Sequence, residues 1–249
     1  MEVLTSRKNT YIRHIRQLAA DSAYRREQGE YLCDGMKTLR EALSFGAQVV
    51  SVLWKGEAQP TEGLENAMQL LAPTELFDYA SPMTNSPGPL FAVRIPDRPL
   101  PAKLDNALVL EGVQDPGNVG TVIRTANAFG IGAVILTGGC ADLYQPKTVR
   151  ATMGAIFRQT VLQLEPERLI PFLREQRLPL YGAALSDRAA DLRRMDLKHA
   201  AIAVGSEGRG LSVGLLNQCD GQLIIPMQPD SESLNAAVAA SVLMWEMVR

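Results

Sequence analysis

The sequence predicts an α/β protein, with a parallel sheet covered by helices on both faces in its C-terminal half and a smaller α/β domain before it. From residue 107 onwards, short apolar runs alternate with helical patterns, and such alternation is typical of a parallel sheet. The 249 residues are 46% hydrophobic and 21% charged, which fits a globular protein with a substantial core. A chain of this length forms one large domain or two small ones.

The N-terminal part carries the weaker pattern. Residues 8–26 suit one basic amphipathic helix, because apolar side chains recur on one side of it. A strand over 30–34, a helix over 36–45 and a strand over 48–54 follow, and the pattern continues weakly to about residue 80.

A proline-rich stretch then interrupts regular structure. Six of the 15 prolines fall between residues 82 and 101, and proline removes a backbone donor and fixes φ. We therefore expect a first domain at residues 1–95, a linker at 96–105 and a second domain at 106–249. Residues 90–95 could form the last strand of the first domain.

The second domain alternates regularly. The expected strands are 107–110, 133–136, 159–162, 180–184, 201–204 and 221–225, and the expected helices are 119–129, 147–155, 166–176, 213–217 and 234–248. Pro146 is well placed to open the second of these helices.

Charge argues against a protein that binds nucleic acid by bulk attraction alone, since the formal net charge is −2 and the pI about 5.8. The distribution is uneven, however. Residues 1–26 hold six arginines and lysines against two carboxylates, a local excess of four positive charges.

The cysteines, the histidines and the hydropathy of the chain bear on its cellular setting, on metal binding and on membrane insertion. The three cysteines are widely spaced, which favours a reducing, cytoplasmic setting over a disulfide framework. The two histidines lack metal-ligand spacing, so we expect no metal site. The longest apolar stretch, 236–245, is too short to span a bilayer, and we expect no membrane partner.

Three segments of the second half, 118–124, 204–212 and 225–235, each follow or carry an apolar strand and offer glycines or short polar side chains at its end. In a parallel α/β sheet, ligands bind at the carboxyl edge of the strands. We therefore predict that the three segments form one site. They lack the glycine spacing of dinucleotide-binding and P-loop motifs.

Each segment also has a purely structural interpretation. Asn118 could simply cap a helix, and the glycines at 205, 208 and 210 could make a tight turn or let the backbone approach a flat ligand. Arg124, among apolar neighbours, could be a salt-bridged surface residue or a site cation.

The segments are similar to the three motifs of the SpoU/TrmH family of S-adenosylmethionine-dependent RNA methyltransferases. NVGTVIRTANAFG resembles the first motif, VGSEGRGLS the second, and IPM followed by SLNAAVAAS the third. The intervening QPKTVRATMGAIFR and the N-terminal SRKN to REAL stretch also resemble the family, so the match covers nearly the whole chain. One departure is Pro229, where family members often carry glycine, and a stiffer loop is expected there.

The resemblance implies a deep trefoil knot in the C-terminal domain, a substrate-binding N-terminal domain related to ribosomal-protein folds, and a homodimer with its site at the interface. The residues that match the family's catalytic and polar site positions are Arg124, Asn118, Glu207, Ser233 and Asn235. The expected S-adenosylmethionine-binding residues are Leu136, Thr137, Gly138, Val204, Gly205, Ser206, Ile225, Met227, Ser233 and Leu234.

The implied reaction is transfer of a methyl group from S-adenosylmethionine to a ribose 2′-hydroxyl of structured RNA, with ribosomal RNA favoured over transfer RNA. The expected RNA-binding residues are Arg7, Lys8, Arg13, Arg16 and Arg124. The family's arginine is sometimes assigned as the base, whereas a guanidinium pKa above about 12 favours a phosphate- and alkoxide-stabilising role. The alternative function is a non-catalytic RNA-binding or ribosome-assembly protein with the same fold.

Overall fold

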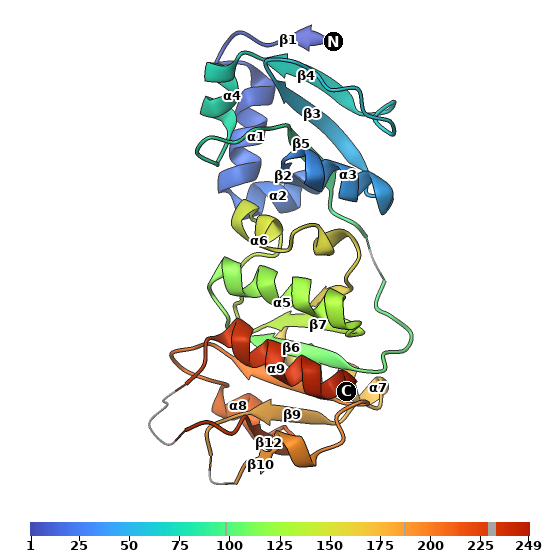
Figure 1. Cartoon of the computed structure of the whole chain (residues 1–249), viewed down its shortest axis with the longest axis vertical. Helices are drawn as coiled ribbons and strands as arrows, with labels where there is room; N and C mark the ends of the chain where they lie inside the picture. Colours follow the sequence, from blue (N-terminus) through green and yellow to red (C-terminus); the bar gives the residue numbers. More distant parts are fainter. Residues whose placement is uncertain (98, 187, 229–232) are drawn as a thin grey trace. The chain divides into compact units, whose positions relative to one another are not determined.

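The computed structural model divides into two compact units, Met1–Arg98 with Asp142–Phe157, and Pro99–Ala141 with Arg158–Arg249. Figure 1 traces the elements of both. The structure describes residues 1–97, 99–186, 188–228 and 233–249. Pro229 therefore lies outside the described residues. No helix within these ranges combines the length and the apolar content needed to cross a bilayer.

The first unit is built on a five-stranded mixed sheet. Its strands, in spatial order, are β1 (Glu2–Val3), β4 (Met68–Ala72), β3 (Val49–Lys55), β5 (Leu90–Arg94) and β2 (Glu30–Asp34). Its four longer helices are α1 (Thr10–Ala20), α2 (Ser22–Gln28), α3 (Met36–Ser44) and α4 (Thr74–Ala80). Strand β5 runs antiparallel to both β2 and β3, so the last-strand interpretation of residues 90–95 is confirmed.

The single helix expected over residues 8–26 is wrong, because Asp21 divides it. Asp21 has an extended backbone, with φ −120° and ψ 117°. Its carboxylate accepts hydrogen bonds from the backbone N–H groups of Ala23 and Tyr24, at 2.8 and 3.2 Å. Aspartate favours this capping role at a helix start, and it outweighs the continuous amphipathic pattern.

The second unit contains a seven-stranded sheet in which every pair of neighbouring strands is parallel. The predicted parallel sheet is confirmed. The strands, in spatial order, are β10 (Ala190–Asp191), β12 (Gly221–Ile224), β9 (Leu180–Ala183), β11 (Ala201–Gly205), β6 (Ala107–Glu111), β7 (Ala133–Thr137) and β8 (Val161–Gln163).

Helices cover both faces of this sheet. On one face, α7 (Pro166–Glu175) and α8 (Val213–Leu216) share a buried apolar cluster with alternate residues of β6, β7 and β11. On the other, α5 (Pro116–Phe129) packs beside α9 (Ala236–Val248), as Figure 1 shows in green and red. Asn235 caps α9 by accepting from Ala237 N–H at 3.0 Å, so the helix expected over 234–248 begins at Ala236.

Residues 142–157, which the sequence interpretation left within 106–249, cluster with the first unit instead. They form α6 (Pro146–Ala151) and the short helix η1 (Ala155–Phe157). The buried Arg25 guanidinium binds the Asp142 carboxylate at 2.7 Å and donates to the Leu18 carbonyl at 2.6 Å. A buried arginine needs such partners, and this pair anchors the segment to α2.

Candidate active site

The three sequence segments meet at one edge of the second unit's sheet. Strands β6, β11 and β12 are parallel members of that sheet, so the loops that follow them leave from the same edge. Helix α5 begins at Pro116 and is capped by Asp115, whose carboxylate accepts from Asn118 N–H at 3.0 Å. The interpretation of Asn118 as the helix cap is therefore wrong, and its side chain is available to the site.

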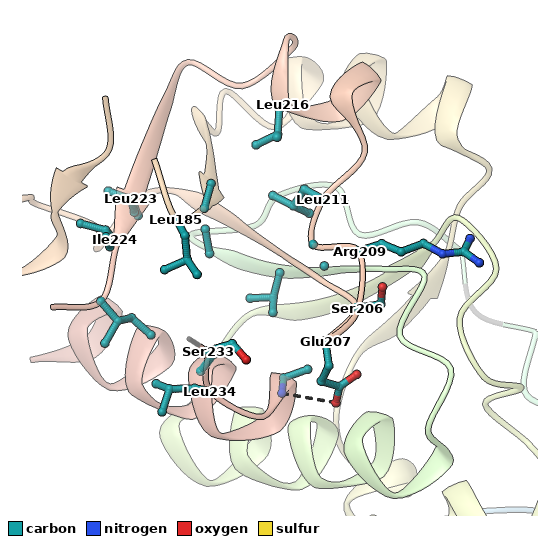
Figure 2. Close-up of a pocket in the computed structure, with 18 of the residues that line it drawn as sticks. Leu185, Ser206, Glu207, Arg209, Leu211, Leu216, Leu223, Ile224, Ser233 and Leu234 are labelled. Atoms are coloured by element: carbon teal, nitrogen blue, oxygen red, sulfur yellow. Dashed lines mark hydrogen bonds between the residues drawn. The ribbon is translucent and has the colours of Figure 1, made fainter. Parts of the chain in front are cut away.

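A network of polar side chains joins the three segments. Glu207 Oε1 accepts from Asn118 Nδ2, and from Asn235 Nδ2 and Ala236 N–H at 3.4 Å each. Asn235 Nδ2 also lies 3.1 Å from Asn118 Oδ1. Figure 2 shows the Glu207 carboxylate directed at the start of α9, where the helix dipole favours a negative charge.

A cavity of about 380 Å³ opens beside this network. Seven of the expected cofactor residues line it: Val204, Gly205, Ser206, Ile225, Met227, Ser233 and Leu234. Glu207, predicted as a catalytic residue, also lines it, as do Arg209, Gly210 and Leu211 of the predicted segment 204–212. Sequence reasoning missed the remaining lining residues, which are Ala183, Ala184, Leu185, Leu216, Leu223, Ile224, Ala236 and Ala239. The wall is mainly apolar with a few hydroxyl and charged groups, as is usual for sites that bind a small organic ligand.

Gly205 sits where the chain returns against the end of β11. Ser206 and Gly210 form an antiparallel bridge, with Gly210 N–H donating to the Ser206 carbonyl at 2.8 Å. A Cβ at position 205 would lie 2.0 Å from the Gly210 carbonyl carbon, so only glycine fits. The tight-turn and the ligand-site interpretations of this segment are thus compatible, because the turn itself forms part of the cavity wall.

Glu111, which sequence reasoning missed, holds the far end of the same loop. Its carboxylate accepts from Ser212 N–H at 2.7 Å and from the Ser212 hydroxyl at 2.8 Å. Ser212 Oγ in turn caps α8 by accepting from Leu215 N–H at 3.1 Å. A carboxylate at the end of β6 was the only sequence signal for this contact.

Leu136, Thr137 and Gly138 do not line this cavity. Leu136 and Thr137 are buried at the end of β7, Gly138 follows them, and β6 separates β7 from β11 in the strand order. The cavity wall comes instead from Ala183 at the end of β9, on the other side of β11, and from Ala184 and Leu185 after it.

None of the expected RNA-binding cations is a lining residue of the cavity. Arg124 is exposed on α5, and it makes no hydrogen bond or ion pair with any residue that the structure describes. The other four, Arg7, Lys8, Arg13 and Arg16, are exposed on the first unit.

Among the described residues, no three His, Cys, Asp or Glu side chains gather where they could hold a metal ion. His14 lies in the first unit, hydrogen-bonded to the Tyr24 hydroxyl at 2.9 Å. Burial raises the pKa of Cys219 to about 11 and also raises that of Cys140, so neither thiol near the second unit's sheet ionises readily at neutral pH.

Comparisons with known proteins agree with this site. The model of the SpoU rRNA Methylase family matches residues 105–245. The 23S rRNA (guanosine(2553)-2′-O)-methyltransferase RlmP of Bacillus subtilis is 32% identical over 248 residues, which cover 99% of both chains. The crystal structure of the SpoU methyltransferase AviRb from Streptomyces viridochromogenes, in complex with the cofactor AdoMet, is 26% identical with a TM-score of 0.88, covering 97% of this chain and 98% of that one.

An AdoMet-bound rRNA methyltransferase from Sinorhizobium meliloti is also similar, with 25% identity and a TM-score of 0.86 over 99% of this chain and 97% of that one. The fold and site are those of an RNA methyltransferase. The chain belongs to the SpoU rRNA Methylase family, and the family resemblance inferred from the three motifs is confirmed.

Proposed function

We propose that this protein transfers the methyl group of S-adenosylmethionine to a ribose 2′-hydroxyl of ribosomal RNA. The observation that carries the proposal is the hydrogen-bonded set of Asn118, Glu207 and Asn235 at the mouth of a largely apolar cavity. Relatives named as 23S rRNA 2′-O-methyltransferases, from Bacillus subtilis and Streptomyces viridochromogenes, support the reaction and the RNA class.

The cavity fits the cofactor. Leu211, Leu223 and Ile224 offer apolar contacts for a flat purine, while the turn at Gly205, Ser206 and Gly210 adds backbone groups to the wall and Ser233 adds a hydroxyl. When bound, S-adenosylmethionine supplies an electrophilic methyl group on a sulfonium. The surrounding loops hold the cofactor and exclude water, so that alignment with the 2′-hydroxyl supplies much of the rate.

Arg124 is the residue that we assign to the RNA. Its exposed guanidinium suits bidentate contact with a phosphate next to the reacting ribose, and its charge stabilises the developing alkoxide as the hydroxyl proton passes to bulk water. A base role would require a neutral guanidinium, which is costly for a group with a pKa above about 12.

Since Arg124 does not line the cavity of its own chain, we further propose a homodimer in which it serves a shared site. Helix α9 is apolar on nearly every side, and Val238 and Trp245 remain 50% and 54% exposed. Such surface is typical of a subunit interface. A monomer in sedimentation velocity at micromolar concentration would contradict this model.

The remaining family features are proposals too. We propose that the second unit contains the trefoil knot, that residues 1–95 recognise RNA, and that the enzyme acts in the cytoplasm, where ribosomal RNA is modified. Tracing the whole backbone in an experimental structure tests the knot.

The decisive experiment combines two measurements on the full chain. Titration calorimetry with S-adenosylhomocysteine should give one site per subunit, and tritium from labelled S-adenosylmethionine should appear as 2′-O-methylnucleotide in unmodified 23S rRNA transcripts. No binding at millimolar ligand would refute the proposal. Cofactor and RNA binding without transfer would instead favour the non-catalytic RNA-binding alternative.

A further inference from the structure

Two arginines of the first unit converge on one tyrosine. The Tyr79 ring of α4 has the Arg7 guanidinium carbon 4.5 Å and the Arg16 guanidinium carbon 4.1 Å from its centroid. Arg16 also donates to the Tyr79 carbonyl at 3.0 Å. The tyrosine therefore fixes two cations that would otherwise sample many rotamers, each through a cation–π contact.

The surrounding surface adds further positive charge. Lys8 and Arg13 are exposed, and Arg13 lies one turn before Arg16 on α1, on the same side of the helix. We call Arg7, Lys8, Arg13, Arg16 and Tyr79 the arginine–tyrosine surface.

None of its four cations forms an ion pair with a described residue, whereas Lys55 and Arg94 of the same unit pair with Asp78 and Glu30 at 2.6 and 3.1 Å. Glu75 is an exposed carboxylate one turn before Tyr79 on α4, on the same side of the helix as Tyr79.

Holding two like charges against one ring costs free energy unless an anion shares them. A guanidinium that donates one N–H to a carbonyl still has its other N–H groups free to donate. Two parallel N–H groups held in one orientation can bind a phosphate bidentately. The chemistry of the surface thus fits a chain of phosphates better than a single carboxylate.

We propose that the arginine–tyrosine surface binds the phosphate backbone of ribosomal RNA, and that Tyr79 positions Arg7 and Arg16 for this contact. This inference rests on the proposed function and identifies the RNA contact within it. The cations bind phosphates, so they anchor the RNA without reading its sequence.

The test compares Arg7→Ala/Arg16→Ala, Tyr79→Leu and Tyr79→Phe with a matched control, Arg168→Ala/Arg174→Ala, which removes two exposed charges from α7 of the second unit. Filter binding of 23S rRNA transcripts between 50 and 200 mM KCl gives the affinity and its salt slope. S-adenosylhomocysteine affinity and thermal melting confirm that each variant is folded.

The arginine double variant should bind RNA about tenfold more weakly, and its salt slope should fall by about 1.5, which corresponds to two lost phosphate contacts. Tyr79→Leu should weaken RNA binding in the same direction, whereas Tyr79→Phe keeps the ring and should behave as wild type. Cofactor affinity should not change in any variant.

The inference would be overturned if the arginine double variant kept the wild-type RNA affinity and salt slope, or if the control lost as much affinity. The proposed function would still hold as long as the wild-type protein methylates RNA. Retained RNA affinity with lost binding to assembled large ribosomal subunits would identify an acidic protein as the partner, against the inference. A wild-type protein that neither binds nor methylates RNA would overturn both.

Discussion

Replacing Gly205 by alanine should damage the cofactor site more than any other single-methyl addition that we can identify in it. The new Cβ would lie 2.0 Å from the Gly210 carbonyl carbon, 2.1 Å from its oxygen and 2.3 Å from Leu211 N. All three are backbone atoms, so no rotamer change can relieve the contact. The return of the loop against β11 must open instead.

The size of that opening follows from the geometry. Real Cβ contacts essentially never fall below 3.0 Å, so the 2.0 Å contact must lengthen by at least about 1 Å. Overpacking of this kind typically costs about 1–3 kcal/mol of folding free energy, and a displacement of about 1 Å in a positioned site can cost about 10²-fold in rate. Because Gly205, Ser206 and Gly210 line the cavity, we expect at least about tenfold weaker S-adenosylhomocysteine binding.

Calorimetric titration and thermal melting measure the two effects separately. Gly208→Ala is the matched control, because a Cβ there meets nothing within 4 Å and the residue lies in the same loop. Gly205→Ala should lower Tm by roughly 2–4 °C for each kcal/mol lost, whereas Gly208→Ala should behave as wild type. Wild-type cofactor affinity in Gly205→Ala would show that the loop is not part of the binding site.

Substitutions at two further positions, Arg124 and Asp34, give other tests. Arg124→Ala should lower the single-turnover methyl-transfer rate by roughly 10²–10³ with cofactor binding nearly intact, and Arg124→Lys should also be severely impaired because an ammonium lacks the bidentate fork. Retention of more than about a tenth of the wild-type rate would move the catalytic role to Asn118 or Glu207. Burial raises the pKa of Asp34 above 3.8, so its contribution to stability is present at low pH and is lost as pH rises through the folded-state pKa. Asp34→Asn keeps an acceptor for the Ser86 hydroxyl. It should remove the loss of urea-denaturation stability that accompanies ionisation of Asp34 as pH rises through its raised pKa, and a variant less stable than wild type at pH 7 would contradict this account.

Local sequence signals predicted much of the second unit. Strand–helix alternation predicted the parallel sheet, and the helices expected over 213–217 and 234–248 are present as α8 and α9. Polar residues after three separate strands predicted a common edge, which the contacts of Glu207 bear out. Each of these inferences depends on neighbours in sequence or on a general property of parallel sheets.

Features that depend on long-range pairing lie beyond such local signals. Strand β11 lies between β6 and β9, and β7 lies beyond β6. Residues 183–185 therefore line the cavity, whereas Leu136 to Gly138 do not. The ion pair of Arg25 with Asp142 joins residues too distant in sequence for any pattern to connect. At Asp21, by contrast, the signal was local. The amphipathic repeat predicted one helix over 8–26, although an aspartate at this position favours a helix cap.

Structural and functional roles coincide in this site instead of competing. Asn235 uses Oδ1 to cap α9 and Nδ2 to reach Asn118 and Glu207, so one amide fixes the helix and aligns the network. Because the cap holds the amide in one orientation, the Nδ2 donors are aimed before any ligand binds, which reduces the entropy lost on binding. A residue with a sufficient structural explanation is therefore still a valid candidate for the site, and contacts made by its remaining polar atom decide the question.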